Sequence, residues 1–480
     1  MFKLINLLNK KNFFYLIFIY LFLAINSVPY LYSFDSYKNY IKIILGYSPI
    51  LIFIFCIIYL YISRLKIRFN LITILLLVFS SYSLLQFPSL IFSDKIIFFH
   101  GFYWIIASVS LPMYLISINA FSEENGIILM NITLIILFII TVFFMYRLMA
   151  DLFFSPVVSF SFYGARALDP NSFFLNSHVP RSSGMSRFSI VFFILFHQIS
   201  INTYFNKKIF KNISLALAIF FLFCVFHFQS RLSIGFVVLY GLFNLIPLFH
   251  RGTFKTLLKK IFILFFCAFL LHLSFPIVNA KIKFDYLGVD RNDLFIHPDI
   301  KPILNIILKS KSESLNLKKN KNKDGDGDNY KEIKKNKEIV RYLDQALKGR
   351  DFTNLNNSGR IDLWKKAIQH IKTSPYIGKG PLADRIYLAE NVSNLLIYSL
   401  LSGGILSFLL ILVFYFCLFV KGFKEVFISL EFKKKKNFYK KISLYYIGYF
   451  IFRSLAEISF GIFGIDYFIL LLSTYILFKN

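Results

Sequence analysis

The chain has 480 residues, of which 57% are hydrophobic and 19% aromatic, whereas only 16% are charged. This composition excludes an ordinary soluble globular protein and predicts a chain that folds mostly in lipid. The formal net charge of +29 does not indicate a nucleic-acid partner, because the lysines and arginines cluster in short gaps between apolar runs. The four cysteines lie inside apolar runs without the spacing of a disulfide or metal site, so we expect no redox or zinc chemistry.

Apolar runs of about 20 residues, the length that crosses a bilayer, recur along the chain. Twelve spans are predicted, at residues 13–30, 41–62, 71–87, 96–118, 127–146, 188–205, 213–228, 232–248, 261–277, 395–420, 442–460 and 462–478. The expected fold is therefore an all-α integral membrane protein with about 12 transmembrane helices. Two membrane domains, 1–279 and 395–480, flank one long loop, 280–394, between the ninth and tenth spans.

Positive charge in alternate gaps predicts the orientation of these spans. The gap with Lys207, Lys208 and Lys211 and the gap with Lys440 and Lys441 are examples. Gaps rich in lysine and arginine stay in the cytoplasm. Both termini are therefore predicted to be cytoplasmic, and the gaps 149–187 and 280–394 are predicted to face the opposite side.

The long outer loop divides into two parts by composition. Residues 317–338 are rich in lysine, asparagine, aspartate and glycine, cannot bury a core, and are predicted to be a solvated insert. Residues 358–373 are predicted to form an amphipathic helix on the membrane or bundle surface. Its apolar face would consist of Ile361, Trp364, Ile368 and Ile371.

Three arginines, Arg181, Arg231 and Arg360, lie in different predicted outer loops, so the topology brings them to one membrane face. A guanidinium is always charged and presents a planar fork to phosphate oxygens, which suits a lipid-linked pyrophosphate. The alternative is that each arginine only anchors to lipid headgroups. The residues alone leave both interpretations open.

The order of motifs in this part of the chain resembles the O-antigen polymerase and ligase family. Ser230-Arg231 and the segment from Arg181 to Gly184 resemble two upstream motifs of that family. The signature region is matched by Asn357-Ser358-Gly359-Arg360, Trp364, Pro375, Gly378, Gly380, Ser393-Asn394 and Gly404. The resemblance covers roughly residues 181 to 420.

This resemblance implies a type C glycosyltransferase of the bacterial inner membrane with a periplasmic active site. Its donor would be an undecaprenyl-pyrophosphate-linked oligosaccharide, used without a nucleotide sugar, a metal or another cofactor. Its partners would be this substrate and membrane lipid. Arg231 and Arg360 would hold the leaving pyrophosphate as catalytic residues. Arg181, Trp364 and Asn394 would bind substrate.

The resemblance leaves the exact reaction open. Family ligases usually carry a histidine where this chain has Ser393, and a serine of ordinary pKa cannot accept the proton. This difference favours a polymerase of repeat units, with or without a chain-length regulator, over a ligase that transfers glycan to a lipid A-core or other acceptor. A flippase of lipid-linked oligosaccharides is the second alternative, although we find no internal repeat of the kind typical of transporters.

Acidic residues complete the candidate site. Asp362, Glu390 and Asp384 are candidates for a general base, with a solvated surface role as the alternative for each. Arg453 and Glu457 are four residues apart in the eleventh predicted span, so they share a helix face and can pair. This pair would either bind substrate or merely hold the bundle together.

Overall fold

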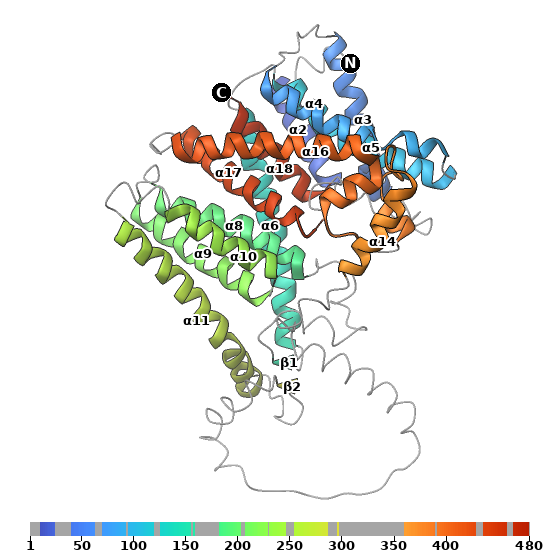
Figure 1. Ribbon diagram of the computed structural model, residues 1–480. Helices are drawn as coiled ribbons and strands as arrows, with labels where there is room; N and C mark the ends of the chain where they lie inside the picture. Colours follow the sequence, from blue (N-terminus) through green and yellow to red (C-terminus); the bar gives the residue numbers. More distant parts are fainter. Residues whose placement is uncertain are drawn as a thin grey trace, which may run out of the picture. The chain divides into compact units, whose positions relative to one another are not determined.

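The computed structural model describes residues 10–24, 40–62, 70–92, 95–119, 125–154, 157–158, 182–202, 207–228, 230–245, 254–286, 295–296, 360–388, 391–428, 435–457 and 464–479. These parts of the chain are helical apart from one pairing of two short strands (Figure 1). The elements are α2 (Lys10–Ala24), α3 (Tyr40–Ile62), α4 (Leu71–Leu84), η3 (Pro88–Phe92), α5 (Lys95–Asn119), α6 (Asn125–Phe154), β1 (Val157–Val158), α8 (Ser182–Ile201), α9 (Lys208–His227), α10 (Arg231–Leu245), α11 (Phe254–Tyr286), β2 (Phe295–Ile296), α14 (Arg360–Thr373), α15 (Ala383–Tyr387), α16 (Leu395–Ile428), α17 (Lys435–Ser454) and α18 (Ile465–Phe478).

Each of the predicted apolar runs overlaps a helix, because a backbone in lipid must pair its own polar groups. Among the described residues, seven helical segments are long and apolar enough to cross a membrane: Leu71–Ile91, Gly101–Ile118, Asn125–Tyr146, Gly184–Ile201, Lys208–His227, Ile261–Lys283 and Leu395–Gly422. Four shorter apolar helices are Phe14–Leu23, Tyr47–Tyr61, Arg231–Asn244 and Ile465–Phe478. The prediction of an all-α, multi-pass membrane protein is confirmed, whereas the number of twelve spans stays a prediction.

The chain divides into two compact units, which are described separately. Unit 1 comprises Met1–Ile136, Asn202–Tyr204 and Leu355–Asn480, and unit 2 comprises Leu137–Ile201 and Phe205–Asn354. The boundary runs through α6, so that this helix contributes to both units.

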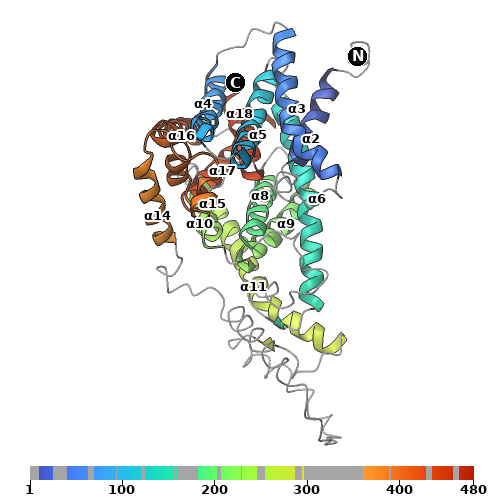
Figure 2. The ribbon, with the colours of Figure 1, turned by 90° about the vertical axis from the view of Figure 1, so that its right-hand side faces the viewer.

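In unit 1, helix α18 lies at the centre of the packing. It contacts α17, α4 and α5, and every one of its residues after Ile465 is buried, as expected for a helix that is apolar on all sides. The ring of Phe79 in α4 lies 5.1 Å from that of Phe414 in α16 and 5.3 Å from that of Tyr467 in α18, between ring centroids. Both views show α4, α16 and α18 together (Figure 1, Figure 2).

In unit 2, α8 packs against α9, and α9 packs against α11. The helices also share polar contacts: Gln198 Nε2 donates to Tyr240 Oη at 2.7 Å and to Asn244 Oδ1 at 3.1 Å. His227 and His272, which look isolated in the sequence, meet with their Nδ1 atoms 3.1 Å apart. The two strands β1 and β2 pair in parallel over two residues each.

The long predicted loop is partly helical. Helix α11 runs to Tyr286, beyond residue 277, where the ninth predicted span ends. The predicted insert 317–338 lies outside the described residues. The predicted amphipathic helix is present as α14, and the short helix α15 was not predicted from the sequence.

Candidate functional site

Helix α14 carries three of the predicted site residues, Arg360, Asp362 and Trp364. It packs on α16 through Leu363 and Ala367, which are both buried. Two residues of the predicted apolar face are instead exposed, Ile361 by 48% and Ile368 by 46%. The buried face of α14 is therefore rotated relative to the predicted one, because Leu363 and Ala367 are buried whereas Ile361 and Ile368 are exposed.

The segment after α14 inserts into a break in α16. Lys379 N donates to Leu401 O at 2.7 Å, Gly380 N donates to Ser402 O at 2.8 Å, and Ile405 N donates to Pro375 O at 2.9 Å. These bonds replace those that α16 loses where Gly404, with φ 70° and ψ −166°, interrupts the helix. A broken apolar helix is tolerated where another part of the protein pairs its backbone groups.

Two glycines of the motif make this insertion sterically possible. Gly378 has φ +76°, and an added Cβ would lie 2.5 Å from the carbonyl group of Ser402. At Gly404 an added Cβ would lie 2.1 Å from Tyr376 O. Both positions therefore require glycine, for backbone conformation and for close approach. The spacing of these glycines in the sequence reflects the interlocking of the two segments.

The loop from Asn391 to Asn394 is held on three sides. Trp364 Nε1 donates to Val392 O at 2.7 Å, which fixes the loop to α14. Val392 N donates to Asp384 Oδ2 at 3.3 Å, and Asn394 Nδ2 donates to Leu455 O at 2.8 Å, just beyond α17. Asn394 also caps α16, since its Oδ1 accepts from Ile397 N at 3.1 Å. Two of the predicted substrate-binding residues, Trp364 and Asn394, thus position this loop.

Ser393 lies at the turn of this loop in a left-handed conformation, with φ 55°. Its backbone N–H donates to Asn391 Oδ1 at 2.8 Å, and its hydroxyl donates to Asn391 O at 3.1 Å. A positive φ is uncommon for a residue other than glycine and occurs often near functional sites. Local hydrogen bonds to Asn391 support this conformation.

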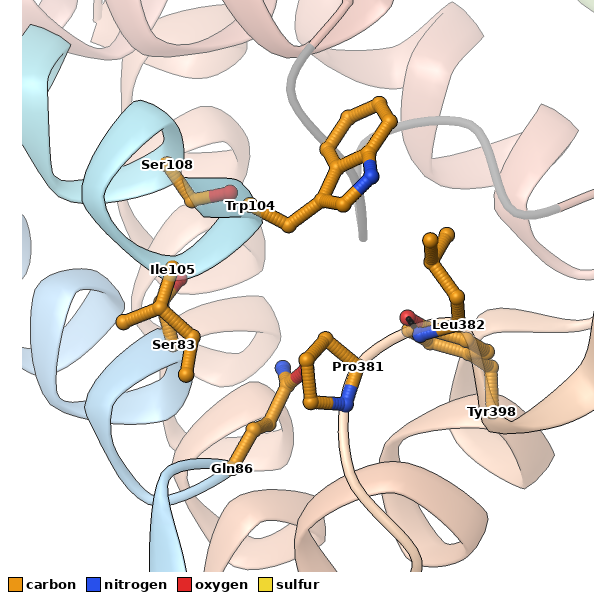
Figure 3. Close-up of a pocket in the computed structure, with 8 residues that line it drawn as sticks. All are labelled: Ser83, Gln86, Trp104, Ile105, Ser108, Pro381, Leu382 and Tyr398. Carbon is orange, nitrogen blue, oxygen red and sulfur yellow. Dashed lines mark hydrogen bonds between the residues drawn. The ribbon is translucent and has the colours of Figure 1, made fainter. Parts of the chain in front are cut away.

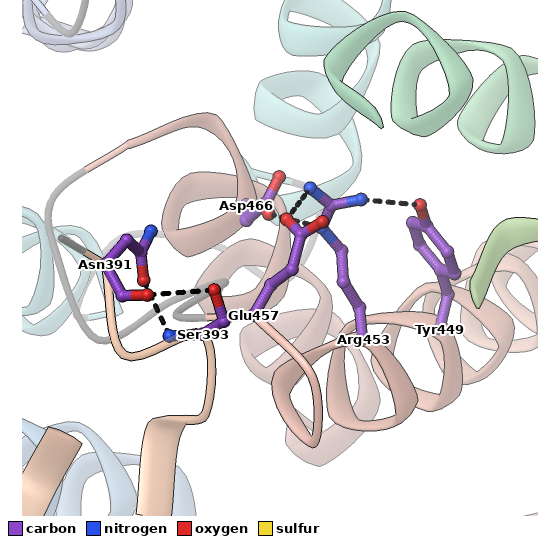
Figure 4. A network of polar contacts seen from close by, with 6 residues as sticks. All are labelled: Asn391, Ser393, Tyr449, Arg453, Glu457 and Asp466. Atoms are coloured by element: carbon purple, nitrogen blue, oxygen red, sulfur yellow. Dashed lines mark hydrogen bonds and ion pairs between the residues drawn. The ribbon is translucent and has the colours of Figure 1, made fainter. Parts of the chain in front are cut away.

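The predicted pair of Arg453 and Glu457 is confirmed, and it belongs to a larger cluster (Figure 4). Arg453 Nη2 contacts the Glu457 carboxylate, and Arg453 Nε donates to Asp466 Oδ2 at 3.2 Å. Arg453 Nη1 also donates to Tyr449 Oη at 3.4 Å. Asp466 was missed from the sequence, although an aspartate in the first turn of an otherwise apolar helix is itself an indication of function.

The cluster has formal charge −1, because two carboxylates face one guanidinium. The side chains of Arg453 and Asp466 are only 4% and 3% exposed, whereas that of Glu457 is 23% exposed. A guanidinium that is already neutralised twice is a poor ligand for a further anion. A further anion is therefore not expected at Arg453, and the predicted role of the Arg453–Glu457 pair in binding substrate stays a prediction.

The candidate bases Asp362 and Asp384 lie in opposite environments. The side chain of Asp362 is 80% exposed and lies 3.8 Å from Lys365 Nζ, as expected for a solvated surface residue. Asp384 is fully buried. Burial raises the pKa of the Asp384 carboxyl above its usual range, although the charge of Arg385 and the N–H of Val392 act in the opposite direction.

The remaining predicted residues are distributed over both units. Arg360 is half-buried in unit 1, and Arg231 is half-buried at the first position of α10 in unit 2. Arg181 and Glu390 lie outside the described residues. The convergence of the three arginines therefore stays a prediction. Among the described residues no group of three His, Cys, Asp or Glu side chains could hold a metal ion.

A small polar cavity of unit 1 lies next to the segment that precedes α15 (Figure 3). Tyr398 Oη, on its wall, accepts a hydrogen bond from Leu382 N at 3.1 Å. Trp104 Nε1 is buried and has no hydrogen-bond partner in the described parts of the chain. Such a site suits a bound water molecule. Its lining residues are Ser83, Gln86, Trp104, Ile105, Ser108, Pro381, Leu382 and Tyr398.

No protein-family model, curated protein sequence or solved structure matches this chain.

Proposed function

We propose that this protein is a membrane-embedded glycosyltransferase of the O-antigen polymerase and ligase type. In this proposal it joins undecaprenyl-pyrophosphate-linked repeat units at the periplasmic face of a bacterial inner membrane, with twelve spans and both termini in the cytoplasm. The polymerase is preferred over the ligase because Ser393 stands where the ligases have a histidine. The order of motifs from Arg181 to Gly404 supports the family.

The observation that carries the proposal is the position of the two arginines at helix starts. Arg231 is the first residue of α10, and Arg360 is the first residue of α14 as described. The N-terminus of a helix has unpaired backbone N–H groups and a partial positive charge, and both features favour an anion there. Phosphate groups bind at such helix starts. Both sites are thus suited to a pyrophosphate.

The arrangement around α14 supports a role for the motif beyond folding. Trp364 lies one helical turn after Arg360 and holds Val392, while Asn394 joins the same loop to the end of α17. The loop from Asn391 to Asn394 is therefore held in place relative to Arg360. Electrostatic stabilisation of a leaving group needs a fixed cation of this kind.

Substitution of the two arginines by lysine tests the pyrophosphate site. Arg360→Lys and Arg231→Lys keep the charge but lose the two-pronged contact, so each variant should lose roughly ten- to a hundredfold in polymer formation while inserting normally. Arg385→Lys, at an exposed arginine of α15, is the matched control and should keep its activity. Wild-type rates for both helix-start variants would make these arginines headgroup anchors instead.

The lipid-linked glycan pool of a deletion strain distinguishes the alternative functions. Loss of a polymerase leaves single repeat units on the carrier, whereas loss of a ligase leaves long chains on it. Loss of a flippase leaves units on the cytoplasmic leaflet. We expect single repeat units on the outer leaflet.

Reporter fusions test the orientation on which the mechanism depends. Fusions after Lys211 and Lys441 should read cytoplasmic, and those after Asp169 and Asp326 should read external, because charge in the short gaps sets insertion. A cytoplasmic signal at Asp326 would put the arginines on the wrong side for an externalised donor.

A further inference from the structure

The ion cluster at the end of α17 contains one carboxylate that is both oriented and accessible. Arg453 and Asp466 are almost fully buried, whereas the side chain of Glu457 is 23% exposed. Glu457 is held by Arg453, which is itself fixed by Asp466 and by Tyr449. The three buried partners thus restrict the position of an acid that solvent or substrate can reach.

The position of this acid connects it with the motif loop. Asn394 Nδ2 donates to Leu455 O at 2.8 Å, and Leu455 is two residues before Glu457. The loop with Ser393 and Asn394 is therefore attached to the turn that carries Glu457. Figure 4 draws Ser393 of this loop together with Glu457. The same loop is attached to α14 through Trp364. The side-chain hydrogen bonds of Asn394 and Trp364 to backbone carbonyls thus connect the turn that carries Glu457 with helix α14.

The other described acids of this region are less suitable as a base. The side chain of Asp362 is 80% exposed to solvent, and Asp384, which accepts a hydrogen bond from Val392 N, is fully buried. A general base must reach the hydroxyl group from which it takes the proton. Among these three acids, only Glu457 combines restricted geometry with partial exposure.

We propose that Glu457 is the general base of the transfer reaction and that Arg453 and Asp466 are positioning residues; this inference rests on the proposed function. The proton of the acceptor hydroxyl passes to a Glu457 carboxylate oxygen, and the hydroxyl oxygen forms a bond to the anomeric carbon of the donor sugar. The bond from that carbon to the pyrophosphate oxygen breaks, and its electron pair leaves with the carrier pyrophosphate. Water then takes the proton from Glu457.

The test compares three amide variants of the purified full-length protein with carrier-linked repeat units as substrate. Glu457→Gln should lower kcat by on the order of a hundredfold or more with little change in KM, and should lose the acidic limb of the pH profile. Asp466→Asn should lower kcat by about tenfold and keep that limb, because it disturbs only positioning. Glu425→Gln, which breaks the Lys421–Glu425 pair at the same four-residue spacing, should behave as wild type.

Titratable groups close to Glu457 in the described residues are Arg453 and Tyr449 of α17 and Asp466 of α18, so the Asp466→Asn profile controls for them.

Should Glu457→Gln fail to accumulate, Glu457→Asp decides: it should keep the acidic limb at reduced kcat, and an unchanged kcat overturns the inference. Wild-type activity of Glu457→Gln would overturn the role of Glu457 as general base. So would equal losses of kcat in Glu457→Gln and Asp466→Asn with pH profiles like that of the wild type. Both results leave the proposed function intact. A wild-type protein without polymerising activity overturns both.

Discussion

The two ends of helix α16 differ in backbone regularity. The end that starts at Leu395 is capped by Asn394, broken at Gly404 and paired with the segment 375–380. The other end is a regular helix with one ion pair, Lys421 Nζ to Glu425 Oε1 at 2.9 Å. An uninterrupted helix would cross lipid at lower cost, because it pairs every backbone group internally. Irregular backbone of this kind occurs often at functional sites, so we expect the functional region at this end of α16.

A pair of glycine substitutions tests this difference most strongly. Gly404→Ala places a Cβ 2.1 Å from Tyr376 O at a φ of +70°, so we expect a loss of roughly 4 kcal/mol or more in stability, seen as loss of folded protein after detergent extraction. Gly422→Ala, at the regular end, meets only the flexible end of Leu444 at 3.0 Å. It should change stability by no more than about 1 kcal/mol. Equal tolerance would show that the break is not required.

The next contrast is between the ion cluster of Arg453, which is attached to the irregular end through Asn394 and Leu455, and the ion pair of the regular end. Arg453→Ala leaves the buried Asp466 and the partly buried Glu457 without their cation, which should cost about 3–5 kcal/mol. Lys421→Ala leaves a single carboxylate and should cost about 1–2 kcal/mol. Thermal stability of the two purified variants, measured from the protein that remains monodisperse after heating, compares them directly. A smaller loss of stability for Arg453→Ala than for Lys421→Ala would contradict the stabilising role of the Arg453 cluster.

The two tryptophans of the chain provide a smaller and equally direct contrast. Trp364→Phe removes the donor to the buried Val392 carbonyl, so it should cost about 1–3 kcal/mol and loosen the motif loop. Trp104→Phe removes a buried N–H without a partner in the described residues and should be neutral or stabilising. The same heating assay measures both. A costly Trp104→Phe would indicate that a water molecule in the cavity binds this indole.

The smallest expected effect is a pH dependence at Asp384. Because burial raises its folded pKa above the unfolded value of about 3.9, this group stabilises the fold at pH below that value and loses its contribution as pH rises through the folded pKa. Asp384→Asn cannot ionise. Its stability relative to wild type should therefore increase with pH across this window and then level off. A constant difference between the two proteins would refute the raised pKa.

The sequence predicted features that are local in the chain. Apolar runs identified the helices, and the four-residue spacing of Arg453 and Glu457 identified their pairing. Asp466 was missed because it lies on another helix, and periodicity within one helix does not reveal contacts between helices. Glycines 378 and 404 were noted as a motif, but their reason, the contact of two backbones, depends on tertiary structure.

The acidic candidates show the same limit. Asp362 and Asp384 are equivalent in sequence terms, since both lie in the predicted outer loop. Their burial differs completely: Asp362 is 80% exposed, whereas Asp384 is fully buried and accepts a hydrogen bond from Val392 N. The burial of a side chain depends on which face of its helix it occupies and on packing partners that are distant in the chain. Candidate acids could therefore be identified from the sequence, but they could not be ranked.

Polymerisation by the purified protein alone tests the central proposal most directly. Wild-type protein in lipid nanodiscs would be mixed with a single undecaprenyl-pyrophosphate-linked repeat unit, and the length of the carrier-linked glycan would be measured by gel electrophoresis over time. The account predicts a ladder of products that grows by one repeat unit per step, with release of carrier pyrophosphate in equal amount. Unchanged repeat units in the presence of folded, monodisperse protein would contradict it.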